Sequence, residues 1–293
     1  MNFWEILKVI LLGIVEGITE WLPVSSTGHM LLIDAIPFLT LKASEAFKEA
    51  FFVVIQLGAI LAVIVLFWKK LFPFSLQKQS AENEENKTKT KLVTDMGILR
   101  LWGKVLVACL PAAVLGLLLD DFLDEHLYRP IVIALTLILY GVAFIVVENR
   151  NRGKELPIKT AQDISYKQAL IIGAFQVLSL IPGTSRSGAT ILGALLCGVA
   201  RPAGAEFTFF LAIPVMVGAS GLKLVKFLLE TGGFTGAEIG YLLIGCAVAF
   251  AVSLAAIKFL IDFVKKHDFK VFGWYRIALG AVVIAALVIP TFF

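Results

Sequence analysis

Six apolar stretches, each about as long as a membrane is thick, limit what this chain can fold into. A helix needs about 20 apolar residues to cross the hydrocarbon core of a bilayer. Stretches of that length occupy residues 46–68, 101–119, 130–148, 205–228, 239–261 and 272–292. Of the 293 residues, 59% are hydrophobic and only 16% are charged, unlike a soluble domain. The predicted fold class is an all-α polytopic membrane protein.

Two further apolar regions, 3–40 and 167–200, are interrupted near their middle by polar segments that contain proline and glycine. The interruptions run from Pro23 to His29 and from Pro182 to Thr190, and the apolar pieces beside them are short for full spans. Non-helical backbone survives at membrane depth only where it faces protein or a water-filled cavity. Each region therefore predicts a re-entrant helical hairpin with a polar tip inside the membrane.

The basic residues predict the orientation of the chain. Cytoplasmic loops of membrane proteins carry an excess of Lys and Arg. The connections 69–100, 149–167 and 265–270 are rich in these residues, whereas 120–129 is acidic and 229–238 has none. The first three are therefore predicted to be cytoplasmic and the last two external. Four lysines then lie on the outer side against the rule: Lys42, Lys48, Lys223 and Lys226. The net charge of +4 is modest and resides in loops, so no nucleic-acid partner is expected.

The number of crossings turns this orientation into a topology. Because residue 167 is internal, residue 230 is external and 205–228 crosses once, region 167–200 must enter and leave on the same side. Each half of the chain, about 1–148 and 167–293, then holds a re-entrant hairpin and three transmembrane helices. Because three crossings carry the chain to the opposite side of the membrane, the second half begins there and has the opposite orientation. The chain is therefore predicted to be an inverted-topology repeat that forms one integral membrane domain over 1–293. The polar segment 72–98 is expected to be a solvated cytoplasmic loop.

The two halves share a weak sequence pattern. "GIVEGITEWLPVSSTGH" begins at Gly13 and "GAFQVLSLIPGTSRSGA" begins at Gly173. Glycine, proline and a Ser/Thr cluster recur at similar spacing, with Gln176 standing where Glu16 stands. Both tips are expected to meet at the pseudo-two-fold centre and to line a shared cavity.

The first tip begins with two carboxylates. Glu16 and Glu20 are four residues apart, so on a helix both side chains project from one face. Carboxylates at membrane depth are costly unless they bind a cation or a basic partner, which makes both residues candidate metal ligands. The alternative is a pair of carboxylates at the membrane interface, near Trp21 and Pro23.

Hydroxyl groups follow at the same tip. Pro23 ends the helix, and Ser25, Ser26 and Thr27 can form a turn of hydroxyls and exposed backbone amides. The next helix begins near His29 with its N-terminal dipole directed at the turn, which favours anion binding. Ser25 and Thr27 are therefore candidate phosphate ligands.

The second tip, "GTSRSGAT" at 183–190, repeats this design and adds Arg186. An arginine at bilayer depth beside Ser185, Ser187 and Thr190 is best explained as a phosphate clamp, because its planar fork matches phosphate oxygens. The structural alternative is that Arg186 pairs with a carboxylate of the first tip, and the two are compatible when no ligand is bound.

The combined groups suit phosphoryl transfer. A hard cation on the two carboxylates would bridge to phosphate oxygens, and Arg186 would stabilise the developing charge. Ser26 needs a base, and His29 is one helical turn away. His126 and His267 lie in connecting segments, where solvated surface positions are expected.

At these residues the sequence resembles the undecaprenyl-diphosphate phosphatase family, bacterial membrane enzymes associated with bacitracin resistance. The matching segments are "EGITEWLPVSSTGH" at 16–29, "VIQLGAILAV" at 54–63, "PGTSRSGATI" at 182–191, "EFTFFLAIPVMVGA" at 206–219 and "YRIALG" at 275–280. The resemblance implies hydrolysis of undecaprenyl diphosphate to the monophosphate, which recycles the lipid carrier for cell-wall synthesis. It also implies a site open to the outer side of the plasma membrane, Mg²⁺ or Ca²⁺ dependence, and inverted repeats with two re-entrant hairpins.

By position, Glu16 and Glu20 match the acidic motif of this family, and Ser26 and His29 match its nucleophile region. Arg186, with Ser185 and Thr190, matches its phosphate-binding motif. Ser26 as nucleophile with His29 as base is the favoured assignment, and direct attack by His29 is the alternative. One departure is Phe52, which stands where family members often have a glutamate, so this position is not expected to be essential for the chemistry.

Two other classes compete with this interpretation. Inverted repeats with broken helices also occur in transporters, so a flippase for the lipid carrier is the main alternative. A phosphatase of the phosphatidic-acid type would need a second catalytic histidine near an aspartate, and neither predicted hairpin offers one. The expected partners are a polyprenyl diphosphate lipid and the bilayer itself, and a homodimer is a candidate assembly.

Overall fold

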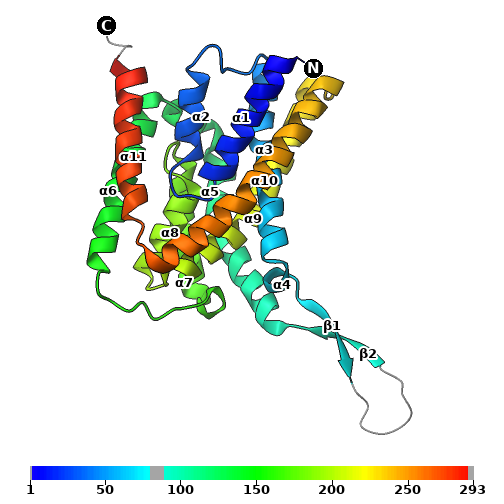
Figure 1. Ribbon diagram of the computed structural model, residues 1–293, viewed down its shortest axis with the longest axis vertical. Coiled ribbons are helices and arrows are strands. Elements are labelled where there is room, and N and C mark those ends of the chain that lie inside the picture. The colour runs from blue at the N-terminus through cyan, green and yellow to red at the C-terminus, as the bar shows by residue number, and fades with distance from the viewer. Residues whose placement is uncertain (1, 80–88, 290–293) are drawn as a thin grey trace.

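Long apolar helices form the body of the molecule (Figure 1). The computed structural model describes residues 2–79 and 89–289. Within these residues, six helices hold a segment long and apolar enough to cross a membrane, which confirms the six predicted spans and a multi-pass membrane protein. These helices are α3 (Glu45–Leu66), α5 (Met96–Leu127), α6 (Pro130–Arg150), α9 (Arg201–Thr231), α10 (Gly236–Lys266) and α11 (Lys270–Val283), which continues into η3 (Ile284–Val288).

Local sequence signals mark where several of these helices begin. The Ser44 side chain accepts a hydrogen bond from the Phe47 amide at the start of α3, and Asp95 caps α5 in the same way. Thr235 and Glu238 form a capping box at the start of α10. Each cap supplies an acceptor to backbone amides that the first helical turn leaves without partners.

Shorter helices replace full spans in the two interrupted regions. The first region forms α1 (Phe3–Thr19) and α2 (Ser26–Asp34), and the second forms α7 (Tyr166–Val177), η2 (Leu178–Leu180) and α8 (Arg186–Leu196). In Figure 1, α1 and α2 occupy the upper half of the molecule, whereas α7 and α8 occupy the lower half. The segments that join the helices of each pair therefore approach the middle from opposite ends.

The two helix pairs pack in matching ways. Helix α1 packs along α10, and α7 packs along α5. A Cβ atom added at Gly13 of α1 would lie 2.9 Å from the carbonyl oxygen of Gly245, and one added at Gly173 of α7 would lie 2.2 Å from that of Ala108. Glycine is required at both positions because the helix backbones approach so closely. Helices α6 and α11 pack against each other, and α3 packs against α9 and α10.

The polar connection at 72–98 is more regular than a solvated loop. After α4 (Trp68–Leu71), strands β1 (Phe74–Gln79) and β2 (Lys89–Thr94) pair antiparallel, with Phe74 opposite Thr94. Antiparallel pairing satisfies the backbone groups of both strands locally. The middle of the predicted loop, 80–88, lies outside the described residues. A further short helix, η1 (Ala161–Asp163), precedes α7.

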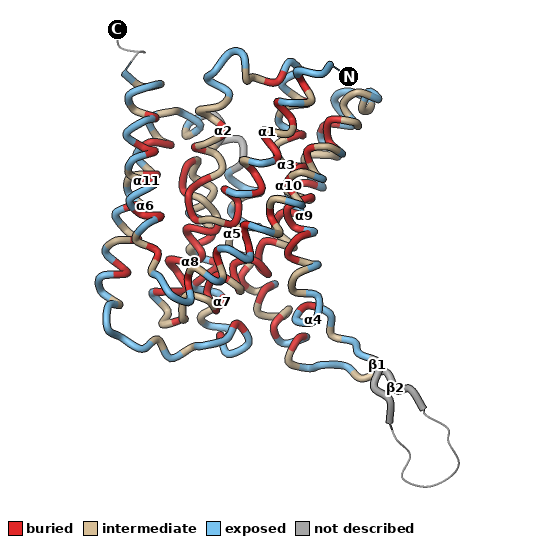
Figure 2. Tube along the Cα trace, in the orientation of Figure 1, coloured by how far each residue is buried: buried red, intermediate tan, exposed pale blue. Residues whose placement is uncertain are grey.

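Buried residues concentrate where the helices face one another (Figure 2). The outer faces carry large exposed apolar side chains, including Leu117, Leu118, Leu135 and Leu139. Such a surface is stable in hydrocarbon rather than in water, in agreement with membrane insertion. The buried polar side chains gather instead around the inner ends of the short helices.

Candidate active site

The two turns that precede α2 and α8 have the same conformation. Ser25 has a φ of 74° and Ser185 a φ of 69°, and they are the non-glycine residues with positive φ in the described chain. The Ser25 hydroxyl accepts a hydrogen bond from the Gly28 amide at 3.3 Å, and the Ser185 hydroxyl accepts one from the Gly188 amide at 3.2 Å. Both serines are therefore N-caps, and their hydroxyl oxygens serve the helices that they begin.

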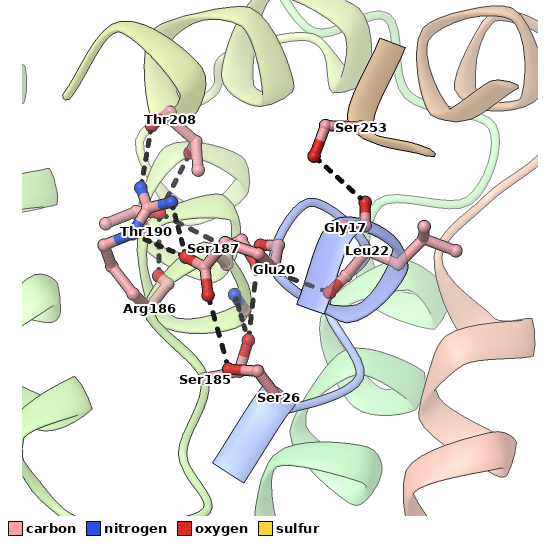
Figure 3. A network of polar contacts seen from close by, with 11 residues as sticks. Gly17, Glu20, Leu22, Ser26, Ser185, Arg186, Ser187, Thr190, Thr208 and Ser253 are labelled. Atoms are coloured by element: carbon pink, nitrogen blue, oxygen red, sulfur yellow. Dashed lines mark hydrogen bonds and ion pairs between the residues drawn. The ribbon is translucent and has the colours of Figure 1, made fainter. Parts of the chain in front are cut away.

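The two tips are in direct contact (Figure 3). The Ser187 hydroxyl of the second tip donates to the Glu20 carbonyl of the first at 3.0 Å. The hydroxyl of Thr190 donates back to the Arg186 carbonyl at 2.9 Å and accepts from Thr208 at 2.9 Å. Ser187 and Thr190 thus support the second tip and its contact with the first.

Arg186 and Glu20 form a buried ion pair between the tips. Nη2 and Nε of Arg186 donate to Oε1 of Glu20 at 2.9 and 3.3 Å, and Nη1 donates to the Thr208 carbonyl at 3.0 Å. The two side chains are only 10% and 7% exposed. The pair between Arg186 and a carboxylate of the first tip, which is the structural alternative for this residue, is therefore the contact that the structure shows.

Ser26 contacts the second oxygen of the same carboxylate. Its hydroxyl donates to Oε2 of Glu20 at 3.3 Å (Figure 3). Ser26, Thr27 and Glu16 line a cavity of about 160 Å³ between α2 and α3. Oε1 of Glu16 is buried and has no hydrogen-bond partner among the described residues. The Glu16 carboxylate and the Ser26 hydroxyl thus line one small cavity, and Ser26 is connected to the Arg186 guanidinium through the Glu20 carboxylate.

His29 lies to one side of this cavity. Its Nδ1 donates to the Ser25 carbonyl at 2.7 Å, and its Nε2 lies 2.7 Å from the hydroxyl of Tyr275 on α11. With the Nδ1 proton donated, Nε2 of a neutral ring accepts from that hydroxyl. The expected contact between His29 and Ser26 is not formed, because both ring nitrogens are engaged elsewhere. His126 and His267 are exposed, as expected from their segments.

Sequence reasoning missed two residues of α11. Tyr275 is the partner of His29, and Arg276 is fully buried with its guanidinium bonded to carbonyls of both tips. A signal for Arg276 was present, since a lone arginine within a transmembrane stretch is a candidate functional residue. Nothing in the local sequence indicates which tip it would contact.

Comparison with known proteins shows the family to which the chain belongs. A family model described as "Bacitracin resistance protein BacA" matches residues 9–282. The chain belongs to the BacA family. Similar proteins come from Enterococcus faecalis (63% identical over 97% of this chain and 98% of that protein), Acetivibrio thermocellus (56% over 96% and 97%) and Lacticaseibacillus paracasei (51% over 98% and 100%), and each is named undecaprenyl-diphosphatase.

The carboxylates of this BacA family member fit a cation that the substrate helps to bind. Within the described residues, no group of three or more His, Cys, Asp or Glu side chains could hold a metal ion. Mg²⁺ is commonly bound through one or two carboxylates together with substrate phosphates. Glu16, with its unpartnered oxygen, and Glu20 meet that requirement once a phosphate supplies the remaining ligands.

Phe52 of α3 lies at the candidate site. It lines the same cavity as Glu16 and Ser26, together with Gln56 of the same helix. An aromatic ring offers no ligand to a cation, so at this position the chain contributes shape to the cavity and no charge. A divalent cation at this cavity would take its protein carboxylates from Glu16 and Glu20, and none from position 52.

Proposed function

We propose that this chain hydrolyses undecaprenyl diphosphate to undecaprenyl phosphate and inorganic phosphate, which recycles the lipid carrier for cell-wall synthesis. The observation that carries the proposal is the chain of contacts from Ser26 through Glu20 to Arg186, at the edge of the cavity that Glu16 lines. Relatives 51–63% identical over nearly the whole chain carry the matching name. Removal of the diphosphate is also the basis for a role in bacitracin resistance, the property that names the family.

Ser26 is the proposed nucleophile. Its oxygen forms a bond to the terminal phosphorus, while the bond between that phosphorus and the bridging oxygen breaks and undecaprenyl phosphate leaves with the electron pair. Oε2 of Glu20, which already accepts the hydroxyl proton, is placed to receive it. Water then attacks the phosphoserine, which releases inorganic phosphate and restores the hydroxyl. His29 as the base, or as the nucleophile, stays a prediction, since its ring would have to leave Tyr275.

Arg186 and the helix ends are the proposed phosphate ligands. The guanidinium donates to Oε1 of Glu20, and a phosphate that approaches Ser26 would replace that partner with its own oxygens. Thr27 lines the cavity, whereas Ser25 and Ser185 act as caps. A divalent cation held by Glu16 and Glu20 would supply charge neutralisation for the diphosphate.

We further propose that the architecture is an inverted repeat with two re-entrant hairpins, open to the outer side of the bacterial plasma membrane. Support comes from the matching pairs α1–α10 and α7–α5 and from the identical turns at Ser25 and Ser185. The basic connections lie at the lower end in Figure 1, the end that α7 and α8 occupy. The cavity also involves Asp34 and Tyr128, at the ends of α2 and α5 that face away from these connections.

The proposal is tested by phosphate release from undecaprenyl diphosphate in detergent, with and without a chelator. Glu20→Gln should abolish turnover while the protein still elutes as a monodisperse gel-filtration peak. Glu148→Gln is the matched control, because Glu148 is also a buried carboxylate paired with an arginine, Arg201, at 2.6 Å. Near-normal turnover by folded Glu20→Gln would refute the site.

A flippase is the alternative function, and the symmetric tips favour it. Vesicles with the lipid substrate confined to one leaflet would detect it: leaflet exchange without phosphate release would replace the hydrolase proposal. The homodimer stays a prediction, which the mass of the particle in a native membrane extract would check.

A further inference from the structure

Arg276 is a buried cation that the reaction described above does not use. It lies in α11, its side chain is 0% exposed, and the segment around it is apolar. Among the described residues its partners are backbone carbonyls and the ring of Tyr140, which lies 5.5 Å from the guanidinium carbon. A charged side chain at this depth is costly, so it must contribute something that an apolar residue cannot.

The guanidinium bridges the two hairpin tips. Nη1 donates to the carbonyl of Pro23 at 3.3 Å, and Nη2 donates to the carbonyls of Gly183 and Thr184 at 2.9 Å each. Pro23 belongs to the turn before α2, and the other two residues belong to the turn before α8. Arginine reaches the two turns with two different nitrogens of one rigid plane, whereas lysine would have to reach both turns from a single nitrogen on a flexible stem.

The carbonyls that Arg276 binds lie one or two residues before the two strained serines, at Pro23 in the first turn and at Gly183 and Thr184 in the second. Positive φ is unfavourable for any residue other than glycine and persists only where the surroundings determine it. Ser25 and Ser185 adopt this conformation, and Ser26 and Arg186 follow them in the chain. A change in either turn would therefore redirect the hydroxyl of Ser26 or the guanidinium of Arg186.

We propose that Arg276 is a positioning residue: by bonding the carbonyls of both turns, it sets the position of Ser26 relative to Arg186. This inference rests on the proposed function of the site. The positioning role differs from a general attraction between a buried positive charge and a diphosphate. Attraction requires only the charge of Arg276, whereas positioning requires the shape of its guanidinium.

Arg276→Lys separates these two roles, since it retains the charge and loses the fork. Positioning predicts a fall in kcat on the order of 10- to 100-fold with KM little changed, because small misplacements of reacting groups cost that much. Attraction by charge predicts normal kcat. Each measurement is made well below the unfolding temperature of the variant, so that lost stability alone does not lower turnover. The matched control is Arg201→Lys. Arg201 lies away from the tips and pairs with the buried carboxylate of Glu148.

A double-mutant cycle with Arg186→Lys provides a second readout. If Arg276 acts through the position of Arg186, the fold decrease in kcat of the double variant is smaller than the product of the fold decreases of the two single variants. For the control double variant, Arg201→Lys with Arg186→Lys, the fold decrease in kcat should equal the product of the two single decreases. Should Arg276→Lys fail to yield a monodisperse protein, Arg276→Gln, which removes the buried charge, enters the same cycle.

The outcomes discriminate between the two proposals. Normal kcat in a monodisperse Arg276 variant, or losses that multiply in the cycle, would overturn the positioning role. Absence of phosphate release by the unmodified protein would overturn the proposed function itself, and retained turnover in Ser26→Ala would overturn the assignment of the nucleophile. Loss of turnover in Ser26→Ala with normal kcat in Arg276→Lys would refute only the inference about Arg276.

Discussion

Ser25 and Ser185 hold the same backbone conformation at the tips of two separate hairpins, and each caps the helix that follows it. Their φ angles are 74° and 69°, and each hydroxyl accepts from the amide three residues ahead. The next residue is Ser26 in one hairpin and Arg186 in the other. One turn design thus presents a hydroxyl from the first tip and a guanidinium from the second.

The caps themselves can be tested through stability. Ser185→Ala should destabilise the protein by about 1 kcal/mol, because the cap is lost and the positive φ remains. Ser185→Gly should cost only a few tenths of a kcal/mol, since glycine tolerates both the cap position and the φ. Thermal unfolding in detergent should therefore rank the glycine variant above the alanine variant, and the reverse order would contradict the cap.

The Glu16 carboxylate should contribute to turnover and should not stabilise the fold. Glu16→Gln removes a proposed cation ligand and is expected to reduce turnover on the order of 100-fold, with a loss of the response to added Mg²⁺. The melting temperature of this variant should be unchanged or higher. The substitution replaces an acidic group, one oxygen of which is buried without a described partner, with a neutral amide.

Gln176 provides the matched control for Glu16. It occupies the equivalent position in the second hairpin, is fully buried, and has no described partner for its side-chain oxygen or nitrogen. Gln176→Leu should keep normal turnover and raise the melting temperature, since it removes an unsatisfied polar group. Equal losses of turnover in both variants would show that burial, and not cation binding, explains the effect at Glu16.

The identity of the nucleophile can be read from the intermediate. Rapid acid quench with substrate labelled in the terminal phosphate should yield a peptide phosphorylated at Ser26, because phosphoserine survives acid. Phosphohistidine does not survive, so label that is lost in acid and retained in base would assign the attack to His29. Ser26→Ala should show no label under either condition.

Phe52 offers a gain-of-function test of the cavity. Phe52→Glu adds a carboxylate to the space that Glu16 lines, and half-maximal turnover should then require less Mg²⁺. Phe52→Leu, which keeps the apolar character, should leave the Mg²⁺ requirement unchanged. A Mg²⁺ dependence that does not respond to the glutamate would place the cation elsewhere.

The apolar spans and the two polar tips follow from the sequence alone, for a physical reason. Hydrocarbon admits only helices of about 20 apolar residues, so a window of that length contains the whole signal for each span. The tips are equally local, because proline, glycine and hydroxyl residues interrupt the apolar pattern within one short segment. The membership of Glu20 and Arg186 in one site was also predictable, since a buried carboxylate and a buried arginine each need a partner.

The partners of the remaining site residues were decided by the tertiary structure. The Ser26 hydroxyl forms its hydrogen bond with Glu20 and not with His29. His29 is hydrogen-bonded to Tyr275, on a helix at the other end of the chain. Arg276 bonds to carbonyls of both tips. Such contacts depend on how closely α1 and α7 pack against α10 and α5, a packing that the glycines of α1 and α7 allow. No short window of the sequence contains both sides of the contacts that His29 makes with Tyr275 and that Arg276 makes with the two tips.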